Sequence, residues 1–499
     1  MKQLIKRIFQ ALLGISLFFL VSGFVITFFL SEKAEKAVVS KMHEQITSEL
    51  QLGRVSFSLY EKFPSASVKI NDLLAFEKEG FDNDTLFYAK ATYIELSIFD
   101  ILLKKIDIKK VIVSEGKINI KYNLDRNPNF TIFKTNKENK NQLKLKKVLL
   151  LNTNVKYQTR NIDIDWQTTQ AMLVFQEQKL SIKATLLSKG LKVHNRDYIN
   201  KKNVKLLTTL SLQKDSIFIQ RGSKVHIEDV IFELSGSVFQ SNIIDLNFSC
   251  EDQELAEIMN HTPEHLTSIY KSFQANGEFS CKGNIKGLIS KENNPLLNMS
   301  CHIDKGNFIL KSRPFILKNI NLDGEITNGE DRNFQKTKIE ITQFDAETEN
   351  GFIKGDFTIQ NLNQYYLTAD LISSWDLAEI SHYFEDSPFF NLQGRVLANT
   401  QYSGHISFDG RFQNYFLNAK HNSTTTFKNA SFKYKAFPLE FNVQSADCKI
   451  QNNTINVTNS IFTIADSDLN FNGDITDLIA YILNKKDKIN LTGDLSSTY

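Results

Sequence analysis

A two-residue alternation of apolar and polar side chains runs through the chain after residue 54, and it constrains the fold more than any other feature. It is clear in "VKIN" (68–71) and "KINIKY" (117–122). Because successive side chains of a β-strand point to opposite faces, each such run predicts a strand with one apolar and one polar face. Asn, Asp and Gly clusters separate the runs, as turns require. Helical periodicity is limited mainly to 251–273 and 375–384. The sequence therefore predicts a mainly β protein.

The predicted apolar faces need a cover, and the few helices cannot supply it. Facing sheets in sandwiches are one solution, and a sheet that curls around another apolar body is the other. The 499 residues include only 7 Pro and as many as 39 Phe, which favours strands, and no linker follows residue 53. We expect an elongated, curled antiparallel β-sheet built from repeats, with a few short helices. The candidate residues of its apolar face are Val68, Ile70, Ile106, Ile108, Ile118, Ile120, Ile162, Ile164, Ile339 and Ile341.

An internal repeat supports the repeated sheet. The phrase "LTADLISSW" (367–375) returns 124 residues later as "LTGDLSSTY" (491–499). Further equivalent pairs are Phe308 with Phe432, Gly277 with Gly394, Gly287 with Gly404, and Gly355 with Gly473, the last pair expected at equivalent turns. A unit of about 120 residues therefore recurs, with a short helix, two or three strands, a crossing and more strands. Such repeats indicate stacked units that share a continuous core.

The second copy stops at Tyr499, where the first copy continues into the helix-like "DLAEI" (376–380). We expect a truncated piece of a longer protein that adds a further unit and a terminal cap. The alternative is a natural stop with the last strand covered by a partner. The expected layout is a cytoplasmic tail at 1–7, an anchor at 8–31, a juxtamembrane helix at 32–52, an N-terminal β domain at 53–135, a groove segment at 136–254, and repeat units at 255–376 and 377–499.

The anchor is expected because residues 8–31 carry no charge. As a helix they would extend about 36 Å, enough to cross a hydrocarbon core of about 30 Å. The run ends without a good cleavage site, which favours an uncleaved span. Three basic residues precede it and three follow closely, so orientation depends on the short tail staying inside while the long domain translocates. Apolar residues four apart in 32–50 predict a helix leaving the bilayer, with Gly53 as its cap.

No catalytic, cofactor or metal site is predicted. Cys250, Cys281, Cys301 and Cys448 lack CxxC spacing, so they are either buried thiols or, outside the cytosol, disulfide partners. "HTPEH" (261–265) has the spacing of a zinc helix, but its proline would break that helix. The net charge of +3, with lysines spread among acidic residues, is no nucleic-acid footprint. A membrane-anchored enzyme is therefore the least favoured of three functional hypotheses, and the other two follow below.

In the N-terminal third, "LGRVSFSLYEKFPSASVKINDLLAF" (52–76) contains a short strand, a Phe-Pro and a second strand. In this it resembles the opening of the AsmA-like proteins of two-membrane bacteria. In "ATYIELSIFDILLKKIDIKKVIVSEGKINIKYNLDRNPNF" (91–130), the family elements are Leu102-Leu103, two strands over Ile106 to Val113, Gly116 and Asn129-Phe130. "DRNPNF" departs from the family's usual Asp-Gly turn.

The resemblance implies a bridge-like lipid-transfer protein with a long, U-shaped repeating β-groove. Such a protein is anchored in the inner membrane, lies mostly in the periplasm, and carries phospholipid toward the outer membrane in envelope biogenesis. Acyl chains would then cover the apolar face, and the ten candidate residues named above would be its lipid-facing lining. Its partners would be phospholipid acyl chains, the inner membrane and other envelope proteins, without nucleic acid. The alternative function is an envelope assembly factor that binds outer-membrane β-barrel proteins through exposed sheet edges.

Overall fold

The structure is a computed structural model that describes most of residues 31–497. The ranges and positions outside its description are 1–30, 33–34, 37, 41, 44–45, 59–60, 62–64, 79–80, 82–83, 98–107, 124, 126, 131–144, 264–272, 291–292, 312–314, 382–388, 408–414, 416, 436, 484 and 498–499. The expected anchor at 8–31 therefore lies outside the described residues, apart from Ser31. Within the described part of the chain, no helix combines the length and apolar character needed to cross a bilayer.

The chain is mainly β, as the alternation predicts. The described strands form one curled sheet of 25 strands, with a few short helices. The chain divides into two compact units, 1–237 with 263–265 and 238–262 with 266–499. Strand β12 (Val230–Phe239) begins in the first unit and ends in the second.

The first unit contains eleven complete strands. They are β1 (Leu50–Gln51), β2 (Val55–Ser58), β3 (Ala66–Phe76), β4 (Thr85–Leu96), β5 (Ile108–Lys121), β6 (Lys147–Gln158), β7 (Ile162–Gln176), β8 (Lys179–Val193), β9 (Arg196–Asp197), β10 (Lys202–Leu212) and β11 (Ser216–Ile227). β1 and β2 both pair with β3, and β5 pairs with β6 in parallel, an exception to the expected antiparallel sheet. A parallel pair needs a long connection, which residues 122–146 supply.

Three local expectations in the first unit are wrong. The predicted helix at 32–50 is helical only in described residues between 31 and 43, and Leu50 and Gln51 instead pair with β3. Gly53 caps no helix, because its N–H bonds to the carbonyl of Asn71 in β3. The family pattern's two strands over Ile106 to Val113 are not found, because the described residues 108–113 belong to a single strand, β5.

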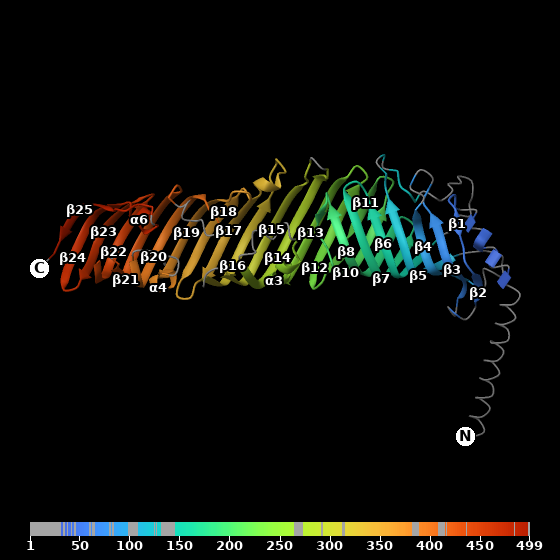
Figure 1. The fold of residues 1–499 in the computed structure, drawn as a ribbon, viewed down its shortest axis with the longest axis horizontal. Coiled ribbons are helices and arrows are strands. Elements are labelled where there is room, and N and C mark those ends of the chain that lie inside the picture. The colour runs from blue at the N-terminus through green and yellow to red at the C-terminus, as the bar shows by residue number, and fades with distance from the viewer. Residues whose placement is uncertain are drawn as a thin grey trace, which may run out of the picture. The chain divides into compact units, whose positions relative to one another are not determined.

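The second unit consists of consecutive antiparallel strands (Figure 1). They are β13 (Ile243–Glu254), β14 (Phe273–Leu288), β15 (Leu296–Leu310), β16 (Phe315–Thr327), β17 (Lys338–Glu347), β18 (Phe352–Gln360), β19 (Tyr366–Asp376), β20 (Phe389–His405), β21 (Lys420–Tyr434), β22 (Phe437–Gln451), β23 (Thr454–Ile464), β24 (Ser467–Thr476) and β25 (Asn490–Ser496). The helices are α3 (Leu255–His261), η2 (Phe334–Lys336), α4 (Leu377–Ile380) and α6 (Leu478–Ile482).

The repeat is visible in this order of elements. The first repeat is β13, α3 and β14 to β18, and the second is β19, α4 and β20 to β24. Each has six strands and one short helix after its first strand. The expected crossing is wrong, because each strand from β13 to β24 pairs antiparallel with its successor in the chain. The helices are also shorter than predicted, since 251–254 and 375–376 belong to β13 and β19.

Gly355 and Gly473 are equivalent, as predicted, but they lie inside β18 and β24 and not at turns. A Cβ at Gly355 would lie 2.1 Å from the carbonyl oxygen of Asp370, and one at Gly473 would lie 2.2 Å from that of Thr492. Glycine at these positions therefore allows the neighbouring strand to approach closely.

Candidate functional site

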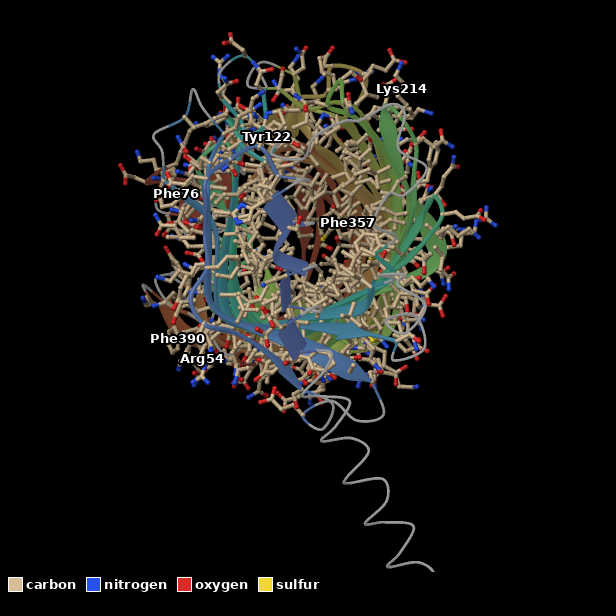
Figure 2. All side chains as sticks on the ribbon, turned by 90° about the vertical axis from the view of Figure 1, so that its right-hand side faces the viewer. Arg54, Phe76, Tyr122, Lys214, Phe357 and Phe390 are labelled. Atoms are coloured by element: carbon tan, nitrogen blue, oxygen red, sulfur yellow. The ribbon has the colours of Figure 1, made fainter. Side chains whose placement is uncertain are left out.

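The candidate site is the face of the sheet that carries the buried apolar residues, which we call the inner face. In the first unit a lateral row of opposed residues crosses five strands on this face: Val113, Leu150, Ala171, Ala184 and Leu206. In Figure 2 the blue-to-green strands of this unit curl around a space filled mostly with carbon atoms. The curl makes one face of the sheet concave, apolar and shared by many strands.

Four predicted groove residues lie together on the inner face of the first unit. Ile120 opposes Tyr157, which opposes Ile164 on the next strand. Ile118 lies two residues before Ile120 and so on the same side of the pleat, and Ile162 stands in the same relation to Ile164. Each of the four is partly buried. The alternation thus assigned these side chains to a common face without knowledge of the pairing.

The remaining predicted residues of the first unit have a different environment. Val68 and Ile70 are fully buried, with 0% exposure, in a cluster that includes Val38 from the helical segment before the sheet. Ile108 packs against the same cluster, whereas Ile106 lies outside the described residues. The chain itself therefore covers the inner face at this end of the first unit.

In the second unit the inner face carries Ile339 and Ile341 on β17. Ile341 opposes Phe357 of β18, whose ring contacts Phe344 edge-on with centroids 5.5 Å apart. Phe357 points into the space that the sheet encloses in Figure 2. Among the described residues of β14, β15, β17 and β18, the inner positions carry no charged side chain. The surface is continuous across the strands and apolar.

Two short helices, α3 and α4, cover this face at one edge of the second unit. Leu255 of α3 packs against Ala275 and Ile303, and Leu377 of α4 packs against Val396 and Ala430. Both helices lie along the same edge of the second unit in Figure 1. Most of the inner face is therefore left to its own side chains or to a ligand.

His421 is a titratable exception on the inner face of β21, opposite Tyr402. Burial lowers the pKa of His421, so the imidazole is neutral at pH 7. The inner face thus keeps an uncharged lining at this position also.

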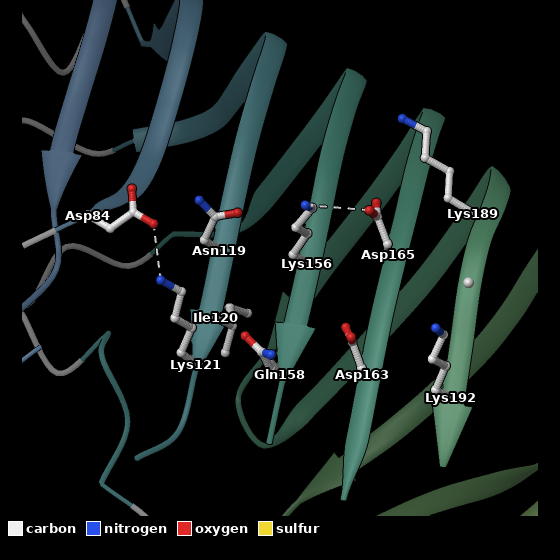
Figure 3. Close-up of a pocket in the computed structure, with 11 residues that line it drawn as sticks. Asp84, Asn119, Ile120, Lys121, Lys156, Gln158, Asp163, Asp165, Lys189 and Lys192 are labelled. Atoms are coloured by element: carbon white, nitrogen blue, oxygen red, sulfur yellow. Dashed lines mark hydrogen bonds and ion pairs between the residues drawn. The ribbon is translucent and has the colours of Figure 1, made fainter. Parts of the chain in front are cut away.

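The outer face carries most of the charged side chains, although single exposed apolar residues such as Ile372 and Leu397 also lie on it. Across β5 to β8 of the first unit it forms a shallow hollow of about 450 Å³ (Figure 3). Four lysines and three aspartates line the hollow, and Lys156 Nζ lies 3.6 Å from Asp165 Oδ2 while Lys121 Nζ lies 3.1 Å from Asp84 Oδ2. The hollow thus mixes charges of both signs, and two of its lysines are paired with aspartates. We interpret it as a solvated face.

Three cysteines form a row on the inner face that sequence spacing did not reveal. Cys250 of β13 opposes Cys281 of β14, which opposes Cys301 of β15. The Sγ atoms of Cys250 and Cys281 are 3.4 Å apart. Their hydrogen bond lowers the pKa of Cys250 and raises that of Cys281, and burial raises the pKa of Cys301 to about 11. All four cysteines of the chain are free thiols.

A second group missed by sequence reasoning is Glu77, whose side chain is completely buried. It accepts a hydrogen bond from Asn129 Nδ2 at 2.8 Å and lies 3.2 Å from Lys121 Nζ. Asn129 also accepts from the backbone N–H of Lys121 and donates to the carbonyl of Asn119. Asn129, singled out by the family resemblance, therefore fixes the chain where β5 ends.

The described residues form no cluster of the kind that binds a metal ion. No group of three or more His, Cys, Asp or Glu side chains there could hold a metal ion. In the "HTPEH" segment, His261 Nε2 lies 3.1 Å from Glu257 Oε2, while Glu264 and His265 lie outside the described residues.

Comparison of the chain with protein-family models, with curated proteins and with solved structures found no match.

Proposed function

We propose that the protein is an AsmA-like carrier of phospholipid, in which acyl chains lie on the inner face while head groups stay in water. The observation that carries the proposal is the contrast between the two faces. The inner positions of β14, β15, β17 and β18 are uncharged, whereas their outer positions include Glu278, Lys282, Asp304 and Glu340. Burial of apolar surface contributes about 25 cal/mol per Å², so an acyl chain is a favourable partner for such a face.

The proposal includes a location. The uncharged segment 8–31 anchors the protein in the inner membrane, with the N-terminus in the cytoplasm and the sheet in the periplasm. The groove then carries lipid toward the outer membrane without a catalytic residue. A phosphatase reporter fused after residue 60 is expected to be active outside the cytoplasm. Activity of a cytoplasmic reporter alone at that position would refute the location.

The central test measures the lipid that copurifies with the protein. We expect phospholipid in the lipid extract of the detergent-purified full-length protein, identified by mass spectrometry. Ile164→Asp places a carboxylate on the inner face of β7 and should remove most of that lipid, because desolvating a charge is costly. Gln167→Asp places the same carboxylate at an exposed outer position of the same strand and should leave the lipid unchanged.

Amide hydrogen exchange separates a lipid effect from unfolding. An open apolar face can rehydrate around the carboxylate that Ile164→Asp introduces, so β7 should keep its protection in both variants. Loss of protection with Ile164→Asp would indicate a closed core and count against the groove. Copurification of unfolded outer-membrane barrel proteins in place of lipid would favour the alternative, an assembly factor.

A further inference from the structure

We propose that Cys250 and Cys281 form a reversible disulfide across β13 and β14, and that Cys301 is the thiol through which oxidation reaches them. The inference concerns the covalent state of the inner face and is independent of what that face carries.

The pairing of the strands supplies the geometry. Directly opposed residues of antiparallel strands have Cα atoms about 4.5 or 5.5 Å apart, within the range of about 4.4–6.8 Å that a disulfide spans. Cys250 and Cys281 are directly opposed, and their sulfur atoms already lie 3.4 Å apart. A small change in side-chain torsion can therefore bring the sulfur atoms into bonding distance.

The three cysteines of the row differ in their exposure to solvent. Cys250 and Cys281 are 2% and 8% exposed, whereas Cys301 is only partly buried. An oxidant in solution consequently meets Cys301 first. Cys281 lies between the other two, opposed to each, so it can exchange with either.

The chemistry is thiol–disulfide exchange with a small-molecule or protein disulfide as oxidant. Burial raises the pKa of Cys301 to about 11, so only a small fraction of this thiol is thiolate near pH 7. That thiolate attacks one sulfur of the oxidant, which releases one thiol and leaves a mixed disulfide. Cys281 then attacks Cys301, releasing the second thiol, and Cys250 finally attacks Cys281 and frees Cys301. Two protein thiols lose two electrons to the oxidant disulfide. Their two protons end on the two released oxidant thiols.

A disulfide between Cys250 and Cys281 would affect the structure around it. Strand pairing is irregular directly after Cys250, between Cys250 and Gln253, and Asp252 there has a φ of 49°. The chain between the two cysteines contains α3, whose Leu255 packs on the inner face. The disulfide would hold this irregular junction, and α3 with it, against separation of β13 from β14.

The test is disulfide mapping of the reduced full-length protein after exposure to oxidised glutathione. Trypsin separates the three cysteines, because lysines lie between them in the sequence. We expect a Cys250–Cys281 peptide pair as the final product. Cys301→Thr should slow its formation at least about tenfold without changing the product, because it removes the accessible thiol. In the Cys250→Ser variant the reaction should end at a Cys281–Cys301 disulfide. The Cys281→Ala variant should form no internal disulfide.

Controls keep the outcomes distinct. Cys448→Ser should behave as the unaltered protein. The positions of the second repeat that match Cys250, Cys281 and Cys301 carry Ser373, Ala398 and Thr425. The replacements therefore suit the fold, and amide exchange checks that each variant is folded. Should Cys281→Ala misfold, the product of Cys250→Ser still decides. The proposal would be overturned if all four cysteines could still be alkylated as free thiols after oxidation. A final disulfide that contains Cys448 would overturn it as well.

Discussion

The two repeats of the second unit share their architecture but differ in one row of inner-face residues. In the first repeat the row across four successive strands is Cys250, Cys281, Cys301 and Gly324, and in the second it is Ser373, Ala398, Thr425 and Cys448. All eight residues are small, yet three neighbouring thiols occur only in the first row. Small size is therefore a requirement of the shared fold at this level, whereas the thiol chemistry is particular to the first repeat.

The repeats differ also where the first strand meets its helix. The pairing of β19 with β20 is regular, and Asp376 Oδ1 accepts a hydrogen bond from Ala378 N at 2.8 Å as a helix cap. At the matching place in the first repeat, Glu254 caps no helix and accepts instead from Gly277 N at 3.1 Å. Side-chain capping favours helix initiation. The irregular junction of the first repeat lacks that cap and is where a disulfide would act.

The largest expected effect is on the alkylation rate of the two partly buried thiols, one in each repeat. Burial raises the pKa of both Cys301 and Cys448 to about 11. Only the thiolate reacts with iodoacetamide, so each alkylation rate should rise about tenfold per pH unit between pH 7 and 10. Peptide mass spectrometry measures both rates in one sample. An alkylation rate that stops rising near pH 8.5 at either cysteine would show that burial does not raise the pKa of that thiol.

The second effect tests the shared backbone. Gly355→Ala and Gly473→Ala should each lower the free energy of unfolding by roughly 3 kcal/mol or more, because the new methyl overlaps a carbonyl of the next strand. Amide exchange of β18 and β24 reports the loss locally. Gly190→Ala is the control, since a Cβ there meets nothing within 4 Å. Equal tolerance of all three substitutions would refute the close approach.

The third effect converts the second repeat toward the first. Ser373→Cys with Ala398→Cys places two thiols on directly opposed residues of β19 and β20. Under oxidation they should form a disulfide that stabilises this repeat by roughly 2–3 kcal/mol, mainly by restricting the unfolded chain. Disulfide mapping and protection of β19 and β20 measure the result. Failure to link in folded protein would show that opposition of the residues is insufficient, and would weaken the proposal for Cys250 and Cys281.

The smallest effect concerns the outer face. Asp245 and Lys286 form an ion pair of 2.8 Å in the first repeat, and the opposed pair at the matching place in the second is Thr368 and Ser403. Replacing Asp245 by Thr and Lys286 by Ser should change the free energy of unfolding by less than about 1 kcal/mol, because exposed ion pairs contribute little. Amide exchange of β13 and β14 checks this. A larger loss would mean that the outer face helps to hold the repeat.

Local alternation predicted the faces well, and the reason is physical. Ile118 and Ile120 share a face because the pleat has a period of two, whatever strand lies beside them. The repeat likewise predicted the equivalence of Phe308 with Phe432, which lie in β15 and β21. Both inferences need only sequence-local information or self-comparison.

Features that depend on strand pairing could not be predicted. Cys250, Cys281 and Cys301 are far apart in sequence, and only the register of β13, β14 and β15 makes them neighbours. The burial of Val68 and Ile70 depends on contact with Val38, which alternation cannot report. The 251–273 helix was overestimated because the polar start of that segment continues the ladder of β13.

Residue-resolved crosslinking to lipid tests the central claim most directly. A photoactivatable amino acid would replace Phe357 on the inner face of β18 or Thr358, its neighbour on the outer face. After illumination in cells, mass spectrometry of the intact protein measures phospholipid adducts. We predict adducts with the probe at 357 and few at 358. Equal adducts at the two positions, or none at 357 in a folded protein, would contradict a lipid-carrying inner face.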